Sequence, residues 1–307
     1  MQPFKGIALK LCAVILFVIM SSLIKVTSDA VPPGQAVFFR SLFAIPVILI
    51  WLLVRGEMTT GLKVRSRMGH VWRGVVGTTA MGLMFAGLGL LPLPEVTALG
   101  YTAPLLVVVF AAMFLDEKVG IYRLGAVALG LVGVIIILVP RLTAFDGPTV
   151  QTAQAVGAVL VLMGAVCAAL AQIYIRKLVQ SEQTSAIVFY FSLTSTALSL
   201  LTLPFGWTIP GGTETALLIL AGLVGGTAQI FLTSSYRHAD ASVIAPFDYA
   251  SMLFAIVIGY VIFDEVPTRH MLFGAVLVVL AGIIIILRER QLGLKRGQAR
   301  ALKTPQG

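Results

Sequence analysis

Residues 96–138 read VTALGYTAPLLVVVFAAMFLDEKVGIYRLGAVALGLVGVIIIL, and residues 244–287 read IAPFDYASMLFAIVIGYVIFDEVPTRHMLFGAVLVVLAGIIIIL. The two stretches align with one inserted residue in the loop of the second. The alignment matches Tyr101 with Tyr249, Asp116-Glu117 with Asp264-Glu265, and Gly133 with Gly282. A repeat of this length is the first feature to settle in a chain, because the two copies should fold alike.

The composition excludes a water-soluble globular protein. The 307 residues are 58% hydrophobic and 11% charged, whereas soluble domains carry about 25% charged residues. The apolar residues form ten blocks close to the length that crosses a bilayer: 6–27, 35–54, 71–91, 95–115, 121–139, 154–175, 185–204, 214–235, 241–263 and 270–287. Lipid offers no hydrogen-bond partner to an open backbone, so each block should be helical. The predicted fold class is an all-α polytopic membrane protein with ten transmembrane helices.

The ten blocks divide into two sets of five, residues 6–140 and 154–288, followed by a basic tail at 289–307. Because five is odd, the second set must enter the membrane upside down relative to the first. The first two spans of each set also align, with Gly6 matched to Gly157, Lys25 to Arg176 and Ser41 to Ser192. Inverted repeats of this kind are typical of secondary transporters, which bind solute near the midplane between the repeats.

The basic residues predict the orientation. The formal net charge is +9. If the N-terminus is cytoplasmic, only four of the 22 basic residues fall on the other side, namely Lys25, Arg40, Arg141 and Arg269. This bias places both termini in the cytoplasm. It also explains the positive charge without a nucleic-acid partner. The tail from 289 either lies against anionic lipid headgroups or is solvated.

Three segments carry a resemblance to a known family. Two are FLDEKVGIYRLGAVALGLVGVIIIL with Glu117 and IFDEVPTRHMLFGAVLVVLAGIIIIL with Glu265, and the third is AVFFRSLFAIPV with Arg40. They resemble the drug/metabolite transporter superfamily, in the branch with paired EamA domains, over residues 6–140 and 154–288. The resemblance implies alternating-access transport of a small organic solute across the bacterial cytoplasmic membrane. ASVIAPFDYASMLFAIVIGYVIFDE looks most like branches for vitamin or adenosyl-type metabolites, although the S-adenosylmethionine-type pattern has a basic residue where Asp248 stands.

Asp248 is the sharpest candidate for a functional side chain, since a polar group inside an apolar span is costly. It lies about 10 Å along the ninth span from its inner end. Pro246 cannot donate a hydrogen bond to the Ser242 carbonyl, so the helix should be loosened there. We expect Asp248 to bind solute, and to carry the proton if transport is proton-coupled. The alternative is a hydrated carboxylate, or one paired with Arg237.

Tyr101 and Tyr249 are repeat mates, so they should enter from opposite faces and converge toward the middle. A tyrosine offers an apolar face and a hydroxyl, which suits a partly aromatic solute; the alternative is ordinary packing with one hydrogen bond. Pro104 frees the Gly100 carbonyl in the same zone and predicts a second helix break.

Four more polar residues are candidates for the solute-binding site, namely Arg40, Gln172, Gln229 and Thr78. Arg40 could instead extend toward the headgroups or bind neighbouring carbonyls, and the two glutamines could instead join helices. Lys25 is expected to extend outward to the interface. The acid pairs at 116–117 and 264–265 are expected to help begin the next helix.

The sequence contains no phosphate-binding G-x-x-x-x-G-K-[ST] loop, no histidine pair with metal-ligand spacing and no nucleophile with a base. No cofactor and no enzymatic activity are therefore predicted. The expected function is secondary transport of a small organic metabolite, with a riboflavin-like vitamin as first choice. The alternatives are an amino-acid or S-adenosylmethionine-type transporter or exporter, a membrane enzyme acting on lipid, and a non-transporting receptor. A homodimer is left open.

Overall fold

The computed structural model describes residues 3–114, 120–142, 149–179, 181–238 and 244–301. Within these ranges the regular structure is all helical, and no β-strand occurs. The elements are α1 (Pro3–Thr27), α2 (Pro33–Leu42), α3 (Ala44–Val54), α4 (Arg67–Leu90), α5 (Leu93–Gly100), α6 (Thr102–Phe114), α7 (Ile121–Leu142), α8 (Thr149–Leu178), α9 (Thr184–Ser199), η1 (Leu200–Phe205), α10 (Gly212–His238), η2 (Ala245–Tyr249), α12 (Ala250–Phe263) and α13 (Arg269–Ala301).

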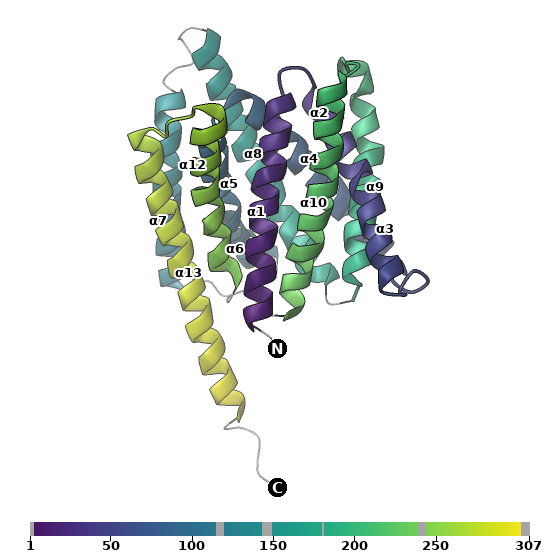
Figure 1. The fold of residues 1–307 in the computed structure, drawn as a ribbon. Coiled ribbons are helices and arrows are strands. Elements are labelled where there is room, and N and C mark those ends of the chain that lie inside the picture. The colour runs from purple at the N-terminus through teal and green to yellow at the C-terminus, as the bar shows by residue number, and fades with distance from the viewer. Residues whose placement is uncertain (1–2, 115–119, 143–148, 180, 239–243, 302–307) are drawn as a thin grey trace.

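The helices form ten crossings of a membrane. Eight segments are long and apolar enough to span a bilayer, and two shorter apolar helices, at 124–140 and 247–263, complete the set within the described residues. The predicted fold class is confirmed. Helix α1 begins and α13 ends at the same end of the bundle, as an even number of crossings requires (Figure 1).

Three of the crossings are interrupted. The second is divided at Phe43 into α2 and α3, the fourth is divided at Tyr101 into α5 and α6, and the ninth begins with the 3-10 turn η2 before α12. The last two breaks lie beside Pro104 and Pro246, where the lost backbone donors predict them. Tyr101 and Tyr249 therefore occupy equivalent positions, each at the break of its own repeat.

The two halves interlock rather than lie side by side. The most extensively packed helix pairs are α1 with α10, α4 with α8, and α7 with α13, and Figure 1 shows α1 beside α10. In order of crossing, these are contacts of the first with the eighth, the third with the sixth, and the fifth with the tenth. A two-fold axis that exchanges crossings one and six, and three and eight, turns the first contact into the second. This packing is the one expected of an inverted repeat.

Small residues permit the closest helix contacts. A Cβ added at Gly133 of α7 would lie 2.7 Å from the backbone oxygen of Gly274 on α13. Close approach of this kind is the usual basis of helix association in membranes. Beyond the bundle, α13 continues as a helix into the basic residues 289–301 and extends past the other helices (Figure 1).

The outer surface of the bundle is apolar. Leu253, Val257 and Val261 of α12 are all more than half exposed. A patch of this kind on a soluble protein would mark an interaction surface. Here it is the surface that contacts lipid, and it leaves the interior as the place where polar side chains gather.

Candidate functional site

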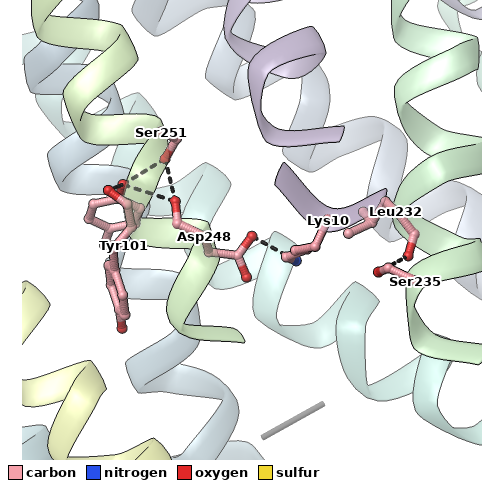
Figure 2. A network of polar contacts seen from close by, with 7 residues as sticks. Lys10, Tyr101, Leu232, Ser235, Asp248 and Ser251 are labelled. Carbon is pink, nitrogen blue, oxygen red and sulfur yellow. Dashed lines mark hydrogen bonds and ion pairs between the residues drawn. The ribbon is translucent and has the colours of Figure 1, made fainter. Parts of the chain in front are cut away.

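Asp248 lies in η2 and forms an ion pair with Lys10 of α1, with 2.7 Å between carboxylate oxygen and Nζ. Figure 2 shows the two side chains meeting between these elements. The Lys10 side chain is 2% exposed and that of Asp248 is 41% exposed. The sequence offered hydration or Arg237 as the ordinary explanation for Asp248. The structure gives it a buried lysine from the other half of the molecule and leaves part of the carboxylate exposed. The Arg237 side chain lies outside the described residues.

The repeat-mate tyrosines are in contact, as the inverted repeat predicts. The rings of Tyr101 and Tyr249 meet edge to face with their centroids 5.0 Å apart. The Tyr101 hydroxyl lies 2.6 Å from Ser251 Oγ, and Ser251 donates to the Asp248 backbone carbonyl at 2.7 Å (Figure 2). Tyr101 thus joins the break in the fourth crossing to the break in the ninth.

A second ion pair lies at the opposite end of α1. Lys25 Nζ is 3.0 Å from Glu265 Oε1, and it donates to the backbone oxygens of Leu88 at 3.0 Å and Leu91 at 2.6 Å. Glu265 Oε2 also accepts a hydrogen bond from the Leu93 amide at 2.8 Å. The expectations that Lys25 extends outward and that Glu265 begins the next helix were therefore wrong. The carboxylate from the second half is held by the first half.

Loop contacts close both ends of the bundle between the halves. At the end that holds the Lys10–Asp248 pair, Glu182 accepts hydrogen bonds from the amides of Arg65 and Ser66 at 2.8 and 2.7 Å. At the other end, Gln35 exchanges two hydrogen bonds with the Thr208 backbone, at 2.9 and 3.1 Å. Each end of the bundle therefore carries a hydrogen-bonded contact between the two halves.

Two buried arginines lie between these closures. Arg40 of α2 is 3% exposed and Arg73 of α4 is 6% exposed. Their guanidinium carbons lie 5.7 and 3.9 Å from the centroid of the Phe191 ring on α9. The Nε and Nη1 atoms of both arginines have no hydrogen-bond partner within the described chain. Arg40 therefore does not extend outward or bind carbonyls, as its alternatives supposed.

The other predicted site residues are dispersed. Thr78 of α4 lies 2.7 Å from Ser195 Oγ of α9, close to Arg73 along the same two helices. Gln229 of α10 is partly buried, and Gln172 of α8 is exposed. The structure thus brings Asp248, Tyr101 and Tyr249 together, and it places Arg40 and Thr78 near Arg73.

Sequence reasoning missed Lys10, Arg73 and Glu182. Lys10 and Arg73 were counted among the cytoplasmic charges, although both lie inside apolar blocks. Both residues lie a few positions inside a predicted span, and that position could have indicated that their side chains are buried. Glu182 sits in a short polar loop, and nothing in the sequence indicates that the loop is buried.

The polar residues of the bundle show no enzymatic constellation. Among the described residues, no group of three or more His, Cys, Asp or Glu side chains could hold a metal ion. The arrangement provides two ion pairs, and it provides hydroxyl groups at the helix breaks. Both kinds of group lie between the two interlocked halves. Such groups can bind and release a solute or change partners.

Two curated relatives of this chain are named as transporters. Among curated relatives, the pseudopaline exporter CntI of Pseudomonas aeruginosa is 32% identical over 91% of this chain and 95% of that protein. The S-adenosylmethionine uptake transporter of Rickettsia felis is 27% identical over 84% of each chain. One solved crystal structure superposes with a TM-score of 0.66 at 20% identity, over 93% of this chain and 98% of that one, which shows the fold.

The sequence profile of the EamA-like transporter family matches the chain twice, at residues 4–139 and 155–288. The two matches cover most of the chain, one on each inverted half. The pattern of paired glutamates and glycine-rich spans, the interlocked packing and the curated relatives all agree with them. This multi-pass membrane protein, with close relatives in bacteria, belongs to the EamA-like transporter family.

Proposed function

We propose that the protein is a secondary transporter that moves a small organic solute by alternating access, along a path between its two inverted halves. The observation that carries this proposal is the pair of ion pairs on α1. Lys10–Asp248 joins one end of α1 to the start of the ninth crossing, and Lys25–Glu265 joins the other end of α1 to the end of that crossing.

The two ion pairs act as latches in this proposal. We define the inner latch as Lys10–Asp248 and the outer latch as Lys25–Glu265. Each latch joins a lysine of the first half to an acid of the second half. Opening toward one face requires the halves to separate there, which breaks one latch and leaves the other in place. In this proposal, the arrangement with both latches formed is the intermediate between the two openings.

The direction of transport and the chemical class of the solute are questions separate from the transport mechanism. One relative is named for export and another for uptake, so relatives alone do not set the direction. Riboflavin itself carries no net charge at neutral pH. Asp248 is neutralised by Lys10, and the centre holds two arginines. We therefore carry forward amino-acid-type and S-adenosylmethionine-type solutes, which bear a carboxylate, ahead of riboflavin.

The proposed location is the bacterial cytoplasmic membrane, with both termini in the cytoplasm. The support is the bias of the basic residues toward one side of the predicted topology. In this orientation the inner latch lies near the cytoplasm, and the outer latch lies near the opposite surface.

The test is counterflow in proteoliposomes. Vesicles loaded with unlabelled solute should take up the same labelled solute transiently without ATP, for at least one of S-adenosylmethionine, L-glutamate or riboflavin. Solutes are first screened for thermal stabilisation of the purified protein, since a bound ligand stabilises the folded state. A solute that binds but never exchanges would indicate a receptor and contradict the proposal. Chemical conversion of a bound solute would indicate an enzyme.

We further propose that Asp248 carries the proton if transport is proton-coupled. Protonation of Asp248 removes the charge that Lys10 binds, so proton binding and opening of the inner latch would be linked. Asp248→Asn should then exchange solute in counterflow but fail to accumulate it against a gradient. Full accumulation by Asp248→Asn under a proton gradient would exclude this role.

A further inference from the structure

The centre of the bundle holds two arginines for which the described residues provide no ion-pair partner. Arg40 and Arg73 are both more than nine-tenths buried. No carboxylate, carbonyl or hydroxyl within the described chain accepts a hydrogen bond from the Nε or Nη1 atoms of either residue. Arg73 also experiences the repulsive charge of Arg40. Among the described residues, the contact that favours these charges is the ring of Phe191, whose centroid lies 5.7 Å from the Arg40 guanidinium carbon and 3.9 Å from that of Arg73.

This arrangement is costly for a structural role. Isolated buried charges are strongly unfavourable unless they are paired and hydrogen-bonded. A cation above an aromatic ring recovers only part of that cost. An arginine that served packing alone would be expected to donate hydrogen bonds to helix carbonyls or to an acid. Lys25 does both at the outer end, with the Leu88 carbonyl and with Glu265. Arg40 and Arg73 do neither, so the missing partner is sought outside the chain.

The surrounding groups leave room for the two guanidinium groups. A Cβ at Gly77 would collide with Arg73 Nη1 and lie 2.9 Å from the Phe191 ring. A Cβ at Gly225 would lie 3.3 Å from Arg40 Nε. Gly77 and Gly225 are separated by the same 148 positions as Tyr101 and Tyr249. The two repeats therefore each supply one glycine, at equivalent positions, to accommodate one arginine.

Two buried hydroxyls follow members of the cluster in the sequence. Ser41 follows Arg40, Ser192 follows Phe191, and the repeat alignment matches both pairs, Arg40 with Phe191 and Ser41 with Ser192. Both serine Oγ atoms are buried and have no partner within the described chain. Because α2 packs against α9, the cluster lies where the two halves meet across their pseudo-two-fold axis.

The arginine cluster lies at the depth expected of a transport site, near the middle of the membrane. Arg40 lies about 10 Å along α2 from one face, and Arg73 lies about 9 Å along α4 from the other. The two residues thus reach the middle of the membrane from opposite sides. A group bound between them is equally distant from both openings, as alternating access requires.

We propose that Arg40 and Arg73, with Ser41 and Ser192, form a site for the carboxylate of an organic acid, and that the transported solute belongs to this class. This inference rests on the proposed transport function and specifies its substrate. A guanidinium fork matches a carboxylate with two parallel hydrogen bonds. Two forks around one ring favour a solute with one carboxylate shared between them, or with two carboxylates.

The first test measures binding without transport. Purified wild-type protein is titrated, at constant ionic strength, with L-glutamate, 2-oxoglutarate, citrate and S-adenosylmethionine. The matched probe without a carboxylate is L-glutamic acid diamide, and the inorganic probes are chloride and phosphate. We expect at least one organic acid to raise the melting temperature by about 5 °C near saturation, with no effect of the diamide. No shift with any carboxylate would overturn the proposal. A shift with chloride or phosphate alone would show an inorganic anion site, and would overturn it as well.

The second test uses Arg73→Met and Arg40→Met. If the arginines serve binding, each variant should lose carboxylate affinity by about 30-fold or more. Each should also melt at the same or a higher temperature than wild type without ligand, because an unpaired buried charge has been removed. Arg55→Gln is the control, since Arg55 is exposed and pairs with Glu57; it should change neither quantity. Variants that melt lower without ligand and keep their carboxylate affinity would assign the arginines to structure and contradict the proposal.

The proposed transport function and the proposed carboxylate site can be refuted independently of each other. Carboxylate binding that depends on the arginines, without counterflow of the bound acid, would retain the site and refute transport. Counterflow of an uncharged solute that is unaffected by Arg73→Met would retain transport and refute the site.

Discussion

Lys10 and Asp248 carry opposite charges 2.7 Å apart, but only Asp248 reaches water. This asymmetry determines what a substitution does. A buried ammonium that loses its carboxylate has no bulk solvent to replace it, whereas a carboxylate that loses its ammonium is still hydrated. At the scale of residues, the buried lysine therefore depends on the acid more than the acid depends on the lysine.

Asp248→Asn should lower the free energy of unfolding by about 1–2 kcal/mol, which is less than for a fully buried pair because the Asp248 side chain is partly exposed. Adding Lys10→Met should recover most of that loss, since the double variant has no buried charge to satisfy. Thermal denaturation in detergent measures both changes. A double variant no more stable than Asp248→Asn would show that the two residues are not coupled.

Glu182 presents a second test at this scale. Its side chain is 1% exposed, and it accepts hydrogen bonds from two amides just before and at the start of α4. Glu182→Ala should cost about 1–2 kcal/mol, because two part-buried amides lose a charged acceptor. Glu57→Ala removes an exposed pair and should stay within about 0.5 kcal/mol of wild type. Equal effects of the two substitutions in denaturation experiments would contradict the assigned role.

At the scale of elements, the helices are positioned by close crossings and by breaks. The fifth and tenth crossings approach at Gly133 and Gly274, where backbone meets backbone. The fourth and ninth are broken at equivalent tyrosines, which touch each other. Rigid crossings hold each pair of helices together, and the breaks supply the places where a helix can bend without losing further hydrogen bonds.

The crossing of α7 and α13 can be tested with two glycines of the same helix. Gly133→Ala would place a methyl group 2.7 Å from a backbone oxygen and should destabilise the protein by about 1–3 kcal/mol. At Gly125 a Cβ meets nothing within 4 Å, so Gly125→Ala should be neutral or stabilising. Melting temperatures of the two variants provide the comparison. Equal tolerance of alanine at both positions would exclude a close α7–α13 contact.

At the scale of the whole molecule, the inversion of the halves predicts which loops share a face. The crossing formed by α2 and α3 separates Gly34 from Arg65. Gly34→Cys should therefore react with a membrane-impermeant maleimide from outside intact cells, and Arg65→Cys only after the cells are opened. Cys12 and Cys167 are replaced beforehand. Labelling of both positions from the same side would contradict the topology.

The sequence allowed the architecture to be predicted, but not the partners of its charges. Ten apolar blocks, their inverted pairing and the helix breaks follow from length, parity and proline chemistry. Which side of a helix faces inward does not follow, because α8 and α12 are apolar nearly all round. Gln172 was expected in the solute-binding site, and the structure leaves its side chain exposed. The latches and the arginine pair join residues from opposite halves, so only the packed structure reveals them.

The central claim is that one enclosed site opens to each face in turn, and accessibility of Ser41 tests it most directly. Ser41 lies buried beside Arg40. In protein lacking Cys12 and Cys167, Ser41→Cys is exposed to a small impermeant thiol reagent from either side of a vesicle. The same measurement is repeated after Lys25→Cys and Glu265→Cys, or Lys10→Cys and Asp248→Cys, are bridged with a short bis-maleimide while the Ser41→Cys thiol is buried.

The account predicts that Ser41→Cys reacts from both faces before bridging. Bridging the outer latch should abolish reaction from the outside and preserve it from the inside, and bridging the inner latch should do the reverse. Reaction from only one face, or reaction that is unchanged by either bridge, would contradict alternating access in this protein.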